Sequence, residues 1–126
     1  MSAVINPANG PGDSWIEDYD NGIIDLHDSG VEVLCYVATG FGHREVQTVL
    51  NDVDQYESLY TGMCDGVFLD EGPTVTTNIS KYEEYYSYIQ SVWPMSTVVV
   101  NPGITPDEAY YHIEDGTVGG QLIIVS

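Results

Sequence analysis

Two adjacent carboxylates, Asp70 and Glu71, stand at the end of a short apolar run and are followed by Gly72. A continuous apolar run of this kind is typical of a strand buried on both faces of a parallel sheet. In α/β folds the active site lies beyond the carboxyl ends of such strands. Paired carboxylates that work without a metal most often cleave glycosidic bonds. The pair therefore predicts acid/base chemistry at this strand end.

The two carboxylates can share one pocket only if the chain departs from regular strand geometry. Adjacent residues on a strand point to opposite faces of the sheet. A twist at Gly72 would bring both acids to one side, where mutual repulsion would leave one protonated and the other ionised. The alternative is that one of them caps the next helix or bonds to a neighbouring loop.

Strand and helix signals alternate along the whole chain, which predicts a single α/β domain over residues 1–126. Strands are expected at 3–7, 31–37, 67–69, 97–100 and 118–125, and helices at 15–29, 45–60, 79–92 and 105–111. This order implies right-handed crossovers and a mainly parallel sheet of β/α units of TIM-barrel type. A complete barrel needs about 200 residues or more. We therefore expect about five strands, in an incomplete (β/α)₈ barrel or an open sheet.

Parallel strands would gather their carboxyl-end residues at one edge of the sheet. Beside the two acids, this set contains Asn6, Tyr36, Thr39 and Asn101, which we expect to be substrate-binding residues. The chain has no dinucleotide-binding glycine turn, phosphate loop, nucleophile elbow or zinc-type spacing. A hard cation held by carboxylate and amide oxygens is an alternative. We expect neither a metal nor another cofactor.

Acidic residues dominate the charge balance. Twenty Asp and Glu residues stand against only Arg44 and Lys81, so the formal net charge is −18. Such a charge excludes nucleic-acid binding as the main function. Abundant carboxylates with little lysine favour a protein adapted to high salt, where a Debye length of about 3 Å at 1 M screens repulsion. An acidic protein from an ordinary medium is the alternative, although such proteins usually carry more lysine.

Neither a membrane span nor a signal peptide is evident in the sequence. No stretch approaches the roughly 18 apolar residues of a spanning helix, and the first residues lack the pattern of a secretory leader. We therefore expect a soluble protein, from the cytoplasm of a halophile or from a high-salt exterior.

Two cysteines, Cys35 and Cys64, are too few for a disulfide scaffold. We expect two buried free thiols. Because both fall in or beside strands that could be neighbours, a single bridge is the alternative.

Four motifs taken together resemble spherulation-specific family 4, the spherulin-4-like proteins. In chain order they are Ile5-Asn6-Pro7-Ala8-Asn9-Gly10-Pro11-Gly12, Tyr36-Val37-Ala38-Thr39-Gly40-Phe41-Gly42-His43-Arg44, Gly66-Val67-Phe68-Leu69-Asp70-Glu71 and Val100-Asn101-Pro102-Gly103. The resemblance runs from about Val4 to Asp115. Each motif is weak alone, but four in order at fitting separations are specific.

The resemblance implies a (β/α)₈ barrel and glycoside hydrolase activity on galactosamine-containing polysaccharide. Asp70 and Glu71 would be the paired active-site acids. The side chains that would line or brace the cleft are Asn6, Tyr36, Arg44 and Asn101. Arg44 also merits attention on physical grounds, because one of two cations in so acidic a chain is expected to hold a carboxylate by a bidentate contact.

The chain departs from the family pattern in a third acid and in length. The family has an acidic residue at the end of the strand after the Asp115 region, and the best alignment places Gln121 there, as a substrate-binding side chain. An amide supplies no acid, base or nucleophile at neutral pH. Five strands also cannot close an eight-stranded barrel, so we expect the free edges to be covered, paired with a second copy or completed by a partner chain.

Two functions follow from this pattern. The first is a glycoside hydrolase acting on an amino-sugar polymer, with Glu71 as proton donor and Asp70 as nucleophile or transition-state stabiliser. The second is a non-catalytic descendant that binds glycan or serves as a structural or assembly subunit. The intact acid pair favours the first, and Gln121 favours the second.

Overall fold

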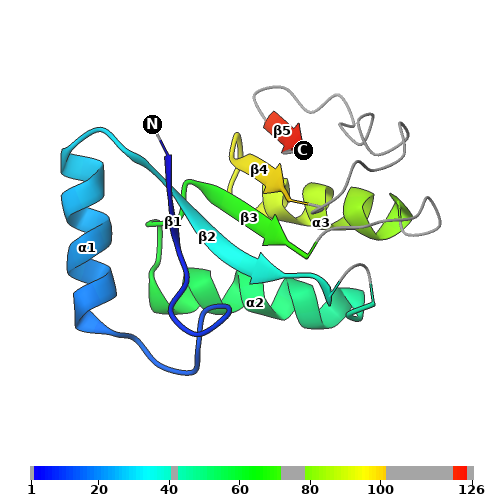
Figure 1. Ribbon diagram of the computed structural model, residues 1–126, viewed down its shortest axis with the longest axis horizontal. Coiled ribbons are helices and arrows are strands. Elements are labelled where there is room, and N and C mark those ends of the chain that lie inside the picture. The colour runs from blue at the N-terminus through cyan, green and yellow to red at the C-terminus, as the bar shows by residue number, and fades with distance from the viewer. Residues whose placement is uncertain (1, 41–42, 72–78, 102–120, 125–126) are drawn as a thin grey trace.

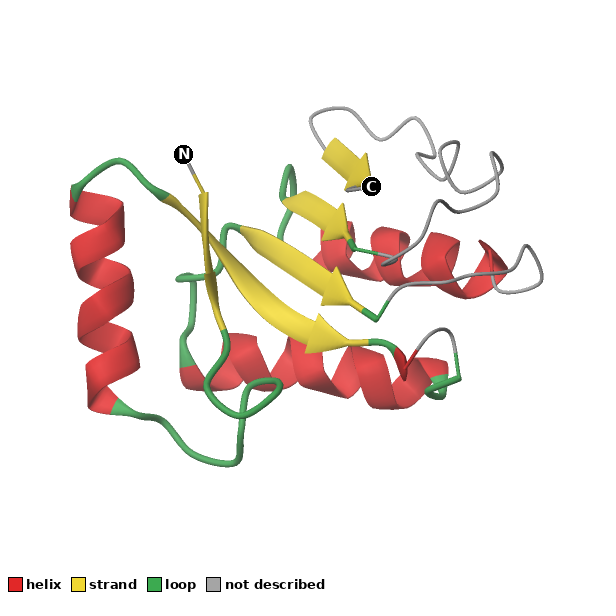
Figure 2. Cartoon of the chain, in the orientation of Figure 1, coloured by secondary structure: helices red, strands yellow, loops and turns green. Residues whose placement is uncertain are grey.

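Parallel strands run in chain order across one five-stranded sheet in the computed structural model (Figure 1). The structure describes residues 2–40, 43–71, 79–101 and 121–124. The elements are β1 (Ser2–Ile5), α1 (Glu17–Asp28), β2 (Glu32–Ala38), α2 (Val46–Leu59), β3 (Gly66–Asp70), α3 (Ile79–Val92), β4 (Thr97–Val100) and β5 (Gln121–Ile124). The predicted parallel α/β fold is confirmed, and Figure 2 shows its alternation of strands and helices.

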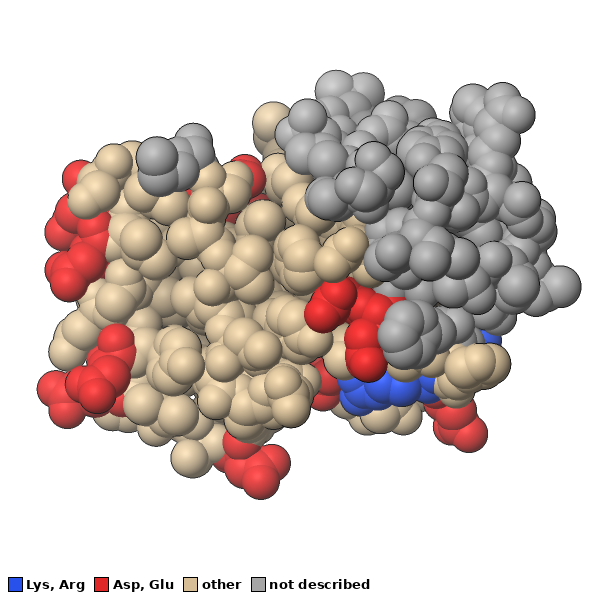
Figure 3. Space-filling view, in the orientation of Figure 1, with Lys and Arg blue, Asp and Glu red and all other residues tan. Residues whose placement is uncertain are grey.

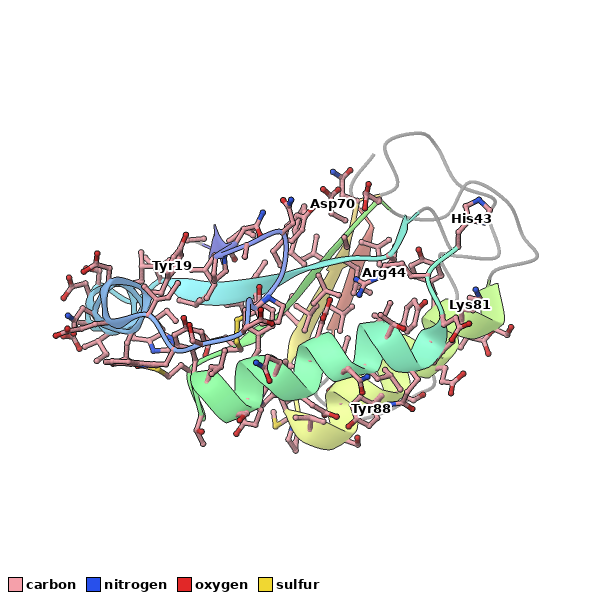
Figure 4. All side chains as sticks on the ribbon, turned by 90° about the horizontal axis from the view of Figure 1, so that it is seen from below. Tyr19, His43, Arg44, Asp70, Lys81 and Tyr88 are labelled. Carbon is pink, nitrogen blue, oxygen red and sulfur yellow. A yellow bond between two sulfur atoms is a disulfide. The ribbon has the colours of Figure 1, made fainter. Side chains whose placement is uncertain are left out.

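The sheet is singly wound, because each described strand pairs with the next one along the chain. Right-handed crossovers between such strands place their helices on one face. Figure 4 shows α2 and α3 side by side along the same face of the sheet. This arrangement is that of β/α units of TIM-barrel type. Among the described helices, none is long and apolar enough to cross a membrane.

The hydrophobic core lies between the sheet and these two helices. Every second strand residue faces it, so the fully buried set includes Val33, Val37, Val67 and Val98. The amphipathic prediction for the tyrosine-rich helix is confirmed, since its recurring side chains are at most 1% exposed: Tyr82, Tyr85, Tyr86 and Ile89. Their periodicity therefore reflects packing on the sheet.

Observed element boundaries lie within three residues of those expected from the sequence. The strand 97–100 and the helix 79–92 coincide with the prediction. β1 ends at Ile5, earlier than expected, because the Asn6 side chain accepts a hydrogen bond from the Gly10 amide and closes a turn there. The expected helix 105–111 lies outside the described residues.

A disulfide joins Cys35 to Cys64, so the expectation of two free thiols was wrong. Cys35 lies in the middle of β2, opposite Val67 of β3, and Cys64 lies two residues before the start of β3. Pairing of the two strands brings the Cα atoms to 6.0 Å, within the range that a disulfide spans. Strand register, which the spacing of the cysteines does not reveal, decides this bond.

Candidate functional site

Asp70 is the last residue of β3, and its carboxylate accepts hydrogen bonds from side chains at the ends of both neighbouring strands. Its Oδ2 accepts a hydrogen bond of 2.8 Å from the Tyr36 hydroxyl of β2. Its Oδ1 accepts one of 3.2 Å from the Asn101 amide, which directly follows β4. Both oxygens therefore act as acceptors, the only role an ionised carboxylate has. The predicted gathering of these three side chains at one sheet edge is what the structure shows.

Tyr36 is a neutral donor to this carboxylate. Burial raises its pKa to about 12, with further contributions from the hydrogen bond to Asp70 and from the negative charges of Asp70 and Glu71. Its ring stacks on Phe68 of the adjacent strand, with centroids 6.2 Å apart. Tyr36 and Phe68 are register partners, so they lie on the same face of the sheet, opposite the buried core.

Glu71 breaks the strand alternation through its own backbone. Its φ is 53°, in the left-handed region, which costs a non-glycine residue about 1 to 2 kcal/mol. The expected twist therefore occurs at Glu71, one residue before the glycine to which it was assigned. The Glu71 charge contributes to the raised pKa of Tyr36. Its carboxylate accordingly lies within electrostatic range of the Asp70 site.

Thr39 does not contact solvent and so cannot contact a substrate in this structure. It is 0% exposed, and its hydroxyl lies 3.0 Å from the Asp70 carbonyl oxygen and 2.8 Å from that of Glu71. The Tyr82 hydroxyl of α3 lies 2.5 Å from the same Thr39 oxygen. Sequence reasoning expected a substrate-binding residue here, and the structure shows a buried contact behind the acid pair instead.

Arg44 braces the loop after β2. Its Nη1 donates to the Ala38 carbonyl oxygen and, at 3.0 Å, to Oδ2 of Asp52 in α2. A carboxylate partner was expected, but one guanidinium nitrogen makes the recorded contact, without the expected bidentate geometry. Figure 4 shows Asp70 and Arg44 at the same end of the molecule, with Arg44 between the sheet and α2. Asp52 was missed because no local pattern marks the partner of a distant arginine.

A polar hollow of about 570 Å³ opens beside Arg44, one strand away from Asp70. Its polar side chains are Asn9, Asp13, Arg44, Asn51, Asp52 and Gln55. Asn6 shapes its rim, because its side chain holds the loop that contains Gly10. In Figure 3 the larger basic area lies next to acidic side chains at this end of the molecule. Amide, carboxylate and guanidinium groups of this kind bind hydroxyl groups.

Gln121 lies away from the site. It begins β5 and pairs in register with Thr97, the first residue of β4. Both therefore lie at the amino edge of the sheet, whereas Asp70 and Asn101 lie at the carboxyl edge. The sequence analysis expected Gln121 at the end of its strand, in the place of a third acid. The register shows it at the start of β5 instead, because sequence similarity did not fix where this strand begins.

The amino edge carries a larger hollow, of about 760 Å³, that contains none of the predicted site residues. There Nε2 of His27 lies 2.7 Å from Oδ2 of Asp65, and the same carboxylate oxygen accepts a hydrogen bond from the Val33 amide. Its volume alone would make this hollow the candidate site, but the adjacent acids Asp70 and Glu71 lie at the opposite edge of the sheet. Within the described ranges no three His, Cys, Asp or Glu side chains cluster as metal ligands.

Comparisons with known proteins agree with this architecture. The family model described as "Spherulation-specific family 4" matches residues 1–119. Spherulin-4 of Physarum polycephalum is 37% identical over 117 residues, which is 92% of this chain and 35% of that protein. The crystal structure of Aspergillus clavatus Sph3 in complex with GalNAc is similar with a TM-score of 0.79 at 26% identity.

That match covers 98% of this chain and 53% of the Sph3 chain. The chain thus spans about half of the solved relative and about a third of Spherulin-4.

Proposed function

Since this chain belongs to spherulation-specific family 4, we propose that it carries the acid pair of a glycoside hydrolase that acts on an amino-sugar polysaccharide. The observation that carries the proposal is the Asp70 carboxylate, held by donors from two flanking strands beside a second acid. Most glycoside hydrolases cleave the glycosidic bond with two carboxyl groups that flank it.

The hydrogen bonds suggest different roles for the two acids. Asp70 has donors on both oxygens, which suits an ionised group that stabilises positive charge or attacks the sugar ring. Glu71 then supplies the proton to the leaving oxygen. The separation of the two carboxyl groups distinguishes a retaining from an inverting reaction, and it is to be measured with a sugar bound.

The substrate class is proposed from the neighbouring hollow and from the relatives. Sph3 was crystallised with GalNAc. The hollow beside Arg44 offers amide and carboxylate groups one strand from Asp70, where the hydroxyl groups of adjacent sugar units could bind. We infer a galactosamine-containing polymer as the ligand.

A non-catalytic glycan-binding or assembly subunit is the second candidate. It is favoured by the lack of any Asp or Glu in the strand expected at 118–125, where the family pattern has a third acid. Polymer binding without cleavage would support this candidate.

Release of reducing ends from galactosamine-containing polysaccharide in concentrated salt tests the proposal. The variants are Asp70→Asn and Glu71→Gln, and each is expected to lose at least about 100-fold in rate, because both acids act in the transition state. Asp25→Asn, an exposed acid of α1, is the matched control and should keep the parent rate. Equal rates for all four proteins would exclude the enzymatic function.

Retention on the immobilised polymer separates the two candidates. If Asp70→Asn binds the polymer as the parent does and neither releases reducing ends, the glycan-binding subunit replaces the hydrolase.

A further inference from the structure

A buried hydroxyl pair lies directly behind the acid-bearing turn. Thr39 and Tyr82 are 0% and 1% exposed, and their hydroxyl oxygens lie 2.5 Å apart. Thr39 follows β2 and Tyr82 lies on α3, so the pair joins the sheet to the helix layer at the carboxyl edge. Neither group contacts solvent, so neither can bind substrate.

The donor and acceptor roles in this contact follow from geometry. The Thr39 hydroxyl oxygen lies 3.0 Å and 2.8 Å from the carbonyl oxygens of Asp70 and Glu71, which can only accept a hydrogen bond. A threonine hydroxyl has one hydrogen to give and two lone pairs to accept with. Tyr82 therefore donates to Thr39, and Thr39 donates to the turn. In such a chain each hydrogen bond polarises the next.

The Thr39 hydroxyl contacts the chain at the turn where the backbone of Glu71 is strained. β3 ends at Asp70, and the Glu71 residue that follows has a φ of 53°. The Glu71 carbonyl lies beyond the end of β3, and its oxygen accepts a hydrogen bond from the Thr39 hydroxyl. The Thr39 amide also donates to the Asp70 carbonyl oxygen, at 3.0 Å. Thr39 thus holds both peptide units on which the direction of the Glu71 side chain depends.

We propose that Thr39 and Tyr82 are positioning residues, which hold Glu71 in its left-handed conformation so that it faces the same site as Asp70. This inference rests on the proposed function for its catalytic consequence. The inference that these residues hold the Glu71 backbone depends only on the hydrogen bonds described above.

The first test uses Thr39→Val, which removes the hydroxyl and keeps the shape, beside Thr39→Ser, which keeps the hydroxyl. Thr39→Val should lose about 100-fold in kcat with little change in KM, as expected for a small misplacement of a reacting group. Thr39→Ser should restore most of the rate. Thr97→Val is the matched control, because Thr97 is also buried but binds Glu32 at the amino edge.

The second test measures the backbone of Glu71 itself by NMR, from its chemical shifts and its amide-to-Hα coupling. The parent should show a positive φ, and Thr39→Val should lose it, whereas Thr39→Ser and Thr97→Val should not. If Thr39→Val fails to fold, Tyr82→Phe serves instead, since it removes the donor to Thr39.

Two results would overturn the positioning proposal. One is an unchanged Glu71 backbone in Thr39→Val or its substitute, and the other is an equal loss of rate in Thr39→Val and Thr39→Ser. A parent without activity would contradict the proposed function only, because the NMR measurement still decides the role of Thr39.

Discussion

At the scale of single residues, the Asp70 carboxylate is the centre of the candidate site, because it accepts hydrogen bonds from Tyr36 of β2 and from Asn101, which follows β4. A hydrogen bond to a charged group contributes about 1.5 to 3 kcal/mol, more than one between neutral groups. The hydrogen bonds from Tyr36 and Asn101 therefore fix the rotation of the carboxylate. The same contacts stabilise the edge of the sheet at which it lies.

The raised pKa of Tyr36 predicts a pH dependence of stability. Its hydroxyl ionises near pH 10 in the unfolded chain and at about 12 in the folded protein, chiefly because of burial. The folded state thus keeps a proton that the unfolded state has lost, and stability falls as pH rises through this window. The contribution of Tyr36 is fully present below pH 10 and is lost as pH approaches 12.

Urea unfolding of the parent and of Tyr36→Phe across this pH range measures the effect. The parent should lose its advantage over Tyr36→Phe as pH rises. Other tyrosines with raised pKa values, such as Tyr85 and Tyr88, lower the stability of both proteins alike. A constant difference between parent and variant would contradict the assignment to Tyr36.

At the scale of the elements, the approach of β3 to β4 depends on a glycine. A Cβ on Gly66 would lie 2.0 Å from the backbone oxygen of Thr97. No side-chain rotation relieves a clash with backbone, so the strands would have to separate. Because Asp70 lies at the other end of β3, this pairing also sets the distance between Asp70 and Asn101.

Gly66→Ala should therefore reduce the free energy of unfolding by about 3 kcal/mol or more, as overpacking against an unyielding neighbour does. Gly22→Ala in α1 is the matched control, since a Cβ there meets no atom within 4 Å. It should stabilise the protein by about 0.5 to 1 kcal/mol, because alanine favours the helix. Denaturant unfolding of both variants checks the pair, and equal stabilities would refute this account of β3 packing.

At the scale of the whole molecule, the disulfide and the charge balance act in opposite directions. The bond between Cys35 and Cys64 restrains the unfolded chain, whereas a net charge of −18 destabilises the compact state through repulsion. The halophilic source and the covering of the sheet edges by a second copy or a partner chain stay predictions.

Removing the disulfide should reduce stability by about 3 to 4 kcal/mol for a loop of this length. The cysteines are 29 residues apart in sequence. The measurement is urea unfolding of the parent with and without reductant, beside the double variant Cys35→Ala/Cys64→Ala. Reduced parent and double variant should unfold together, and the reductant should not affect the variant. An unchanged parent in reductant would contradict a stabilising role for the bond.

Salt should stabilise the protein strongly. Raising sodium chloride from about 0.1 M to about 1 M shortens the Debye length from about 10 Å to about 3 Å, which screens the surface carboxylates. The melting temperature should therefore rise over this range. The variant Asp25→Asn/Asp28→Asn removes two exposed charges near the end of α1 and should rise less. A melting temperature independent of salt in both proteins would contradict the repulsion argument.

Sequence periodicity by itself determined the order of the elements and the location of the acid pair. Alternating strand and helix patterns predict parallel β/α units, and in a parallel sheet the carboxyl ends of adjacent strands must meet. Asp70, Tyr36 and Asn101 could therefore be placed together before their contacts were known. The tyrosine spacing of α3 likewise reports its buried face.

Only the tertiary structure decided the left-handed backbone of Glu71, the buried role of Thr39, the disulfide, and the position of Gln121 at the amino edge. Each depends on strand register or on the packing of a helix against a turn. A shift of register by one residue reverses which side chains are buried, and local sequence alone does not set it. The acid pair can thus be read from the sequence, but the contacts that hold the Asp70 carboxylate and the carbonyl groups of Asp70 and Glu71 come from residues 31 to 34 positions away.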